Sequence, residues 1–135
     1  MLKSIKTSES NRVVVTELTK KLNMGPENVI ARIAFAYSIS QCRKLNISQI
    51  ADSKGKEYSS KVLFGENQDL YTAIICQLYN VNSDNLDIPK FIKMHIDDGL
   101  ELIASKMREN KNLTVFDFIL DQVESGLKAL KNNKS

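Results

Sequence analysis

The sequence predicts a mainly α-helical protein: a single compact helical domain of about five helices with one or two short strands. A chain of 135 residues fits one domain. A hydrophobic content of 42% supplies enough apolar side chain for one core. Apolar residues recur every three or four positions in several segments, which is the period of a helix with one buried face.

The first third of the chain predicts a short strand and two helices. Residues 2–7 alternate weakly between apolar and polar side chains, as a short strand does. The run Thr7-Ser8-Glu9 is a helix start, because it offers capping hydroxyls and an acid in the first turn. Gly25 is placed to end this helix, and Pro26 to begin a second one that fades between residues 40 and 43.

The remaining elements follow from the same patterns. Residues 52–57 form a polar turn, and residues 58–64 predict a short strand or an extended loop. Helices are expected over 67–79, from Pro89 to about residue 107, and from about 114 to 130. Gly99 interrupts the long helix, which a close approach of another helix would explain. We therefore expect a helical domain over 1–110, with an extension over 111–135 that packs on the same domain or on a partner.

Charge is distributed unevenly along the chain. Residues 1–65 carry eleven Lys and Arg against five Asp and Glu, whereas residues 66–135 carry eight against eleven. This asymmetry predicts a basic face built by the N-terminal half, although ordinary solvated lysines fit the pattern equally well. No apolar stretch is long enough to span a bilayer and no secretory signal is present, so the expected location is cytoplasmic. Cys42 and Cys76 are expected to be free thiols there.

Catalytic and cofactor motifs are missing from the sequence. The glycines match neither a phosphate-binding loop nor a dinucleotide fingerprint. His95 and Asp98 lie three residues apart on a predicted helix, so they can form either an acid–base or metal-binding pair, or a histidine held in place by Asp98. A metal site needs more converging ligands than these. We therefore expect no catalytic site, no metal and no cofactor.

The order of the first elements offers an alternative at the N-terminus. A strand followed by two helices joined at a Gly25-Pro26 turn is also the order of a ribbon-helix-helix unit. Such a unit dimerises through intertwined strands that read a DNA groove. Lys3 and Lys6 would be candidates for the groove contacts.

Several short segments, in their order and spacing, resemble the DNA sulfur modification protein DndE family over about residues 5–107. They are Ile5-Lys6-Thr7-Ser8, Leu18-Thr19-Lys20-Lys21-Leu22, Pro26 to Ala34 with Ser38 to Ser40, Gly55-Lys56-Glu57, Leu63-Phe64-Gly65-Glu66, Asp69-Leu70-Tyr71, and His95-Ile96-Asp97-Asp98-Gly99. The resemblance implies a non-catalytic, DNA-binding subunit of the DNA phosphorothioation machinery. It also implies a small helical homo-oligomer, such as a tetramer, that works with separate ATPase and sulfur-transfer subunits. Asp98 departs from the family pattern, where we expect a basic residue, and the chain from about Lys111 lies beyond the resemblance.

These inferences together predict a surface that binds the phosphates of duplex or nicked DNA with little sequence preference. The candidate contacts are Lys54, Lys56, Lys61, Arg43, Lys44, Lys3 and Lys6. Three alternatives stay open: a ribbon-helix-helix repressor or antitoxin, a metal-dependent nicking enzyme built around His95, Asp97 and Asp98, and a structural adaptor without DNA contacts.

Overall fold

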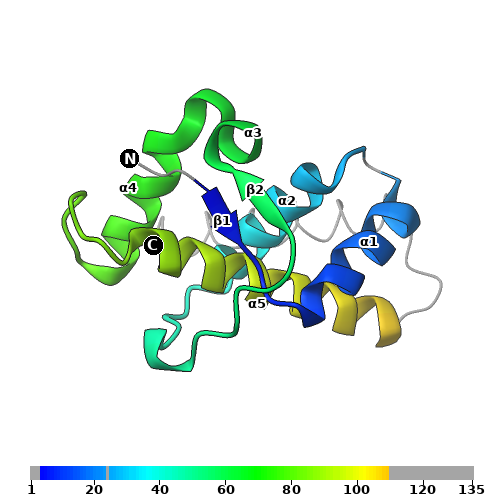
Figure 1. Ribbon diagram of the computed structural model, residues 1–135. Coiled ribbons are helices and arrows are strands. Elements are labelled where there is room, and N and C mark those ends of the chain that lie inside the picture. Colours follow the sequence, from blue (N-terminus) through cyan, green and yellow to red (C-terminus); the bar gives the residue numbers. More distant parts are fainter. Residues whose placement is uncertain (1–3, 24, 110–135) are drawn as a thin grey trace, which may run out of the picture.

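A computed structural model describes residues 4–23 and 25–109, which form a mainly helical domain with one small sheet (Figure 1). The elements follow in the order β1 (Ser4–Lys6), α1 (Ser10–Leu22), α2 (Glu27–Ser40), the 3-10 turn η1 (Ile47–Gln49), β2 (Glu57–Ser59), α3 (Ser60–Phe64), the 3-10 turn η2 (Gly65–Asn67), α4 (Gln68–Tyr79) and α5 (Ile88–Glu109). The predicted fold class is confirmed. The predicted fifth long helix, the extension over 111–135 and Lys3 lie outside the described residues.

The long helix α5 and the helix α2 form the centre of the core. Ile30 and Phe35 of α2 and Ile96 and Leu100 of α5 are almost completely buried. The two backbones meet at Gly99, where an added β-carbon would lie only 1.8 Å from the carbonyl oxygen of Ala34. The close helix approach that Gly99 predicted is therefore confirmed, and only glycine fits at this crossing.

The two strands pair with each other in one antiparallel ribbon. Ile5 lies opposite Tyr58, and both side chains are buried beneath the ribbon. One edge of β1 thus pairs with β2 of the same chain, whereas the strand of a ribbon-helix-helix unit pairs with its counterpart in a second chain. Figure 1 shows the ribbon lying across the middle of α5.

The segment 58–64 corrects the sequence-based prediction of a strand or an extended loop. Only its first two residues are strand, and α3 begins at Ser60. The hydroxyl of Ser59 accepts a hydrogen bond from the Val62 backbone N–H at 3.2 Å, which caps the new helix. One helical turn also buries both Leu63 and Phe64 on the core side, which an alternating strand could not do.

The ends of the other helices agree with the sequence to within a few residues. Asn23, rather than Gly25, takes the left-handed conformation that closes α1, with φ of 49°. Helix α4 covers the predicted 67–79 segment except for its first residue, and Pro89 occupies the first turn of α5. None of the described helices is long and apolar enough to cross a membrane.

Candidate nucleic-acid interface

The connection into β2 brings several cationic residues to one end of the ribbon. The Thr7 N–H donates to the Lys56 carbonyl and the Gly55 N–H donates to the Thr7 carbonyl, both at 2.9 Å, so the 54–56 segment lies against the end of β1. A β-carbon at Gly55 would lie 2.1 Å from the Ser8 carbonyl oxygen, which makes glycine necessary for this approach. The chain connecting η1 to β2 is thus fixed beside Lys6.

Arg12 joins this group from the first turns of α1. Its guanidinium donates to the carbonyl oxygens of Lys54 at 3.1 Å and Gly55 at 3.0 Å. Arg12 was not among the residues predicted from the sequence, because a single exposed arginine opposite an apolar stripe looks like any solvated helix residue. We call Lys6, Arg12, Lys54 and Lys56 together the hairpin surface.

Acidic residues are interleaved with these cations. Lys6 lies opposite Glu57 in the ribbon, and the Lys56 ammonium lies 3.3 Å from a carboxylate oxygen of Glu27. Asp52 accepts hydrogen bonds from the backbone N–H groups of Glu9 and Lys54, and these bonds lower the pKa of its carboxyl group. The hairpin surface is therefore a mixed patch whose cations are close together but locally balanced.

The other predicted contacts lie on neighbouring or more distant elements. Lys61 is exposed on α3, two residues beyond β2. Arg43 and Lys44 are exposed beyond the end of α2, where the Arg43 guanidinium lies 2.5 Å from a carboxylate oxygen of Asp98. The structure thus groups Lys6, Lys54 and Lys56 and places Arg43 in an ion pair with α5.

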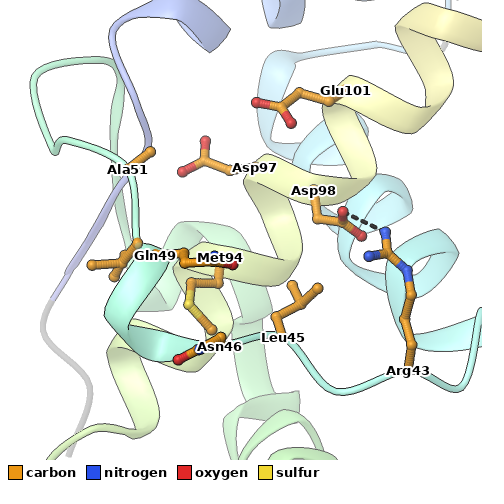
Figure 2. Close-up of a pocket in the computed structure, with 10 residues that line it drawn as sticks. Arg43, Leu45, Asn46, Gln49, Ala51, Met94, Asp97, Asp98 and Glu101 are labelled. Atoms are coloured by element: carbon orange, nitrogen blue, oxygen red, sulfur yellow. Dashed lines mark hydrogen bonds and ion pairs between the residues drawn. The ribbon is translucent and has the colours of Figure 1, made fainter.

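Arg43 lines an acidic pocket of about 310 Å³, which Figure 2 shows. Asp97, Asp98 and Glu101 lie on the α5 side, and the other wall comes from the segment between residues 43 and 51. Burial and the negative charges of Asp97 and Asp98 raise the pKa of Glu101. An anion at Arg43 would lie close to these carboxylates, so this end of α2 is electrostatically unfavourable for negative charge.

His95 belongs to a continuous chain of hydrogen bonds inside the domain. Its ring is fully buried, with Nδ1 2.8 Å from the Ser38 hydroxyl and Nε2 2.7 Å from the Tyr79 hydroxyl. The Ser38 hydroxyl donates to Asp98 at 2.6 Å, and the Leu45 N–H donates to the Tyr79 oxygen at 2.9 Å. We assign the ring proton to Nδ1, because the Ser38 hydroxyl has already given its hydrogen to Asp98.

This chain corrects the expectation that Asp98 holds the imidazole directly. Ser38 lies between them, since the close crossing of α2 and α5 at Gly99 brings the Ser38 hydroxyl within hydrogen-bond distance of both the ring Nδ1 and Asp98. Burial lowers the pKa of His95 to about 4, so the ring is neutral at pH 7. Both ring nitrogens are used inside the protein. Among residues 4–23 and 25–109, no group of three His, Cys, Asp or Glu side chains is arranged to hold a metal ion.

Asp97 forms a second buried polar cluster on the neighbouring face of α5. Its carboxylate lies 2.6 Å from the Lys93 ammonium, and both side chains are more than nine-tenths buried. The Ser8 backbone N–H at 3.1 Å and the Asn11 side-chain amide at 2.8 Å complete its shell. This cluster fixes the start of α1 on α5, and with it the end of the ribbon that carries the hairpin surface.

Comparison with known proteins identifies similar chains. A family model described as DNA sulphur modification protein DndE matches residues 4–111. The chain is similar to the crystal structure of DndE from Escherichia coli B7A, involved in DNA phosphorothioation modification, with a TM-score of 0.62 and 18% identity over 76% of this chain and 99% of that chain. It is similar to a DndE mutant involved in DNA phosphorothioation, with a TM-score of 0.62 and 19% identity over the same shares. At these identities the solved structures show the fold alone. No curated protein sequence matches.

Proposed function

The chain belongs to the DndE family of DNA sulphur modification proteins, and from that premise we propose that it is a non-catalytic, DNA-binding component of a DNA phosphorothioation system. Its role is to hold the sugar–phosphate backbone while separate ATPase and sulfur-transfer subunits carry out the chemistry. The proposal places it in the cytoplasm as a homo-oligomer, in which copies of the hairpin surface lie along one face.

The observation that carries the proposal is the grouping of Lys6, Arg12, Lys54 and Lys56 at one end of the β1–β2 ribbon. Hydrogen bonds to Thr7 and from Arg12 fix the backbone around them, so little backbone freedom is lost when a phosphate binds. Lysine and arginine recognise phosphates without reading base edges, so little sequence preference is expected. The interleaved acids keep the affinity of one copy low, which favours cooperation between copies.

The buried state of the α5 polar residues supports a non-catalytic role. His95 is the only histidine of the chain, and it offers no free ring nitrogen to a substrate. Asp97 is held by Lys93, Asn11 and Ser8, so its carboxylate already has three donors within the protein. The residues that the nicking-enzyme alternative requires are thus used to hold the helices together.

The test is duplex-DNA binding by a variant in which Lys54 and Lys56 of the hairpin surface and the neighbouring Lys61 of α3 are changed to Glu. Each lysine that leaves a phosphate contact lowers the slope of log affinity against log salt by about 1, so the slope should fall by up to about 3 per copy. The matched control changes Lys20, Lys21 and Lys90 to Glu. All three are exposed, so the net charge changes equally on a different part of the surface.

Equal losses for the two variants would mean that binding follows total charge, which would reject the hairpin surface. If the native protein binds neither duplex nor nicked DNA even at low salt, the structural adaptor is favoured instead. A discrete footprint on one sequence would favour a repressor. Metal-dependent cleavage that disappears in His95→Ala would favour the nicking enzyme.

A further inference from the structure

Asp52 lies beside the cations of the hairpin surface, where a negative charge works against phosphate binding. It is exposed, and Lys54 follows two residues later. An exposed acid beside lysines reduces the attraction of the surface for an anion. Any favourable contribution of Asp52 to DNA binding must therefore come from its hydrogen bonds rather than from its charge.

One oxygen of the Asp52 carboxylate joins two segments that are far apart in the sequence. Its Oδ1 atom accepts hydrogen bonds from the backbone N–H of Glu9 and from that of Lys54, each at 3.0 Å. Glu9 is the residue that precedes α1, whereas Lys54 lies in the chain that leads into β2. Both bonds lower the pKa of the carboxyl group, so Asp52 is ionised at neutral pH. The carboxylate thus ties the turn that carries Lys54 to the start of α1.

Asp52 holds the beginning of this turn, and other residues hold its continuation. The Arg12 guanidinium donates to the carbonyl oxygens of Lys54 and Gly55, and the Gly55 N–H donates to the Thr7 carbonyl oxygen. All of these bonds end near the junction of β1 and α1. Figure 1 shows the chain that leads into β2 passing beside this junction. The turn therefore rests on a single support, to which Asp52 supplies the only acidic side chain among these contacts.

The attachment opposes a repulsion that the grouped cations create. The four cations of the hairpin surface carry like charges at one end of the ribbon, and like charges repel one another before an anion is bound. A turn that could move would carry Lys54 away from its neighbours, and ordering it again would cost entropy when DNA binds. The ionised carboxylate of Asp52 both offsets part of the repulsion and fixes the backbone of the turn.

We propose that Asp52 is a positioning residue for DNA binding, which holds Lys54 and its neighbours in place for a phosphate although its own charge repels one. The inference rests on the proposed function and adds to it a residue that makes no phosphate contact. It also predicts the sign of an effect. Loss of the carboxylate should weaken DNA binding, whereas its charge considered alone predicts that binding becomes tighter.

Two substitutions with the same change of charge separate the hydrogen bonds from the charge. Asp52→Ala and Asp52→Asn alter the net charge equally, but the Asn side chain keeps an oxygen that accepts hydrogen bonds. At equal salt, Asp52→Ala should bind duplex DNA about three- to tenfold more weakly than the native protein. Asp52→Asn should bind at least as tightly as the native protein. The matched control is Glu57→Gln, which removes an exposed acid opposite Lys6 and should increase the affinity.

Amide hydrogen exchange in the absence of DNA measures the attachment itself. In Asp52→Ala, the amides of Glu9, Lys54 and Gly55 should exchange at least about threefold faster than in the native protein, because the turn opens more often. Asp52→Asn should remain close to the native rates. The amides of α5 should keep their native rates in both variants, which shows that the domain remains folded.

Equal DNA affinities of Asp52→Ala and Asp52→Asn, whether above or below the native value, would overturn the proposal. Unchanged amide exchange in Asp52→Ala would also overturn it. If the native protein binds neither duplex nor nicked DNA, the proposed function fails together with this role of Asp52. If the native protein binds DNA and the two variants do not differ, only the role of Asp52 fails.

Discussion

The hairpin surface and the charged residues of α5 differ in how their charges are used. On the hairpin surface, Lys6 and Lys54 are exposed, and backbone hydrogen bonds fix the chain around them. On α5, the carboxylate of Asp97 has three donors, and Lys93 is buried against it. Charges that are satisfied inside the protein stabilise the fold, whereas exposed ones remain available to an external anion.

The comparison shows why a charged motif in sequence does not identify a site. The run from His95 to Asp98 contains three titratable groups in four residues, which in sequence resembles a catalytic or metal-binding site. The structure uses it to join α1, α2 and α5. Lys54 and Lys56 look like ordinary loop lysines, yet hydrogen bonds from Thr7 and Arg12 fix the backbone of their loop at the end of the ribbon.

The strongest test of this contrast is Asp97→Asn, which leaves the buried Lys93 ammonium without a counter-charge. We expect a loss of about 3–5 kcal/mol in unfolding free energy, measured by urea denaturation. Adding Lys93→Met to this variant should restore a large part of the loss, because the unpaired charge is removed. A stable Asp97→Asn protein would show that α5 does not depend on this ion pair and would reopen a functional role for Asp97.

The helix crossing that assembles the His95 chain can be broken with a single methyl group. Gly99→Ala places a β-carbon against the Ala34 backbone, and we expect a loss of about 3 kcal/mol, since neither helix can move without disturbing the core. Thermal unfolding measures the effect. The control is Gly25→Ala. No atom lies within 4 Å of a β-carbon added there, and only the positive φ of 101° disfavours a side chain. Similar losses at both positions would contradict the close crossing.

Acid should destabilise the protein through His95. The pKa of this ring is about 4 in the folded protein and near 6.5 when unfolded, so the unfolded chain binds the proton more readily at intermediate pH. Stability is therefore fully present above pH 6.5 and is lost as the pH falls toward 4, by about 2 kcal/mol between pH 7 and pH 5. Denaturation curves across this range should lose that slope in His95→Gln. An unchanged slope would assign the effect to other groups.

The smallest expected effects separate Lys54 from Arg43. Lys54→Gln should leave stability within about 0.5 kcal/mol, because its side chain is exposed. Arg43→Gln removes an ion pair with Asp98 and should cost about 0.5–1 kcal/mol. DNA affinity should respond in the opposite order, since the Arg43 charge is already balanced. A larger loss of DNA binding in Arg43→Gln would place the interface at the acidic pocket instead.

Much of the local structure was predictable from particular residues. Pro89 and the apolar spacing after it predicted α5, the stripe over 67–79 predicted α4, and Gly99 predicted a close helix approach. The segment 58–64 was predicted wrongly. Its β-branched and aromatic residues favoured a strand, whereas Ser59 caps a short helix. The sequence likewise did not predict that Ser38 rather than Asp98 contacts His95, since Ser38 belongs to another helix.

The sequence by itself determined the helical fold class, the family and the asymmetry of charge, because each depends on local period, composition or residue order. Only the tertiary structure decided which charges are satisfied and which are exposed. That outcome depends on side chains far apart in the chain: Arg12 reaches Lys54, Asp98 reaches Arg43 and Asp97 reaches Ser8. Short-range patterns in the sequence do not show such partners, since the packing of α1, α2 and α5 and the path of the chain into β2 set the distances between them.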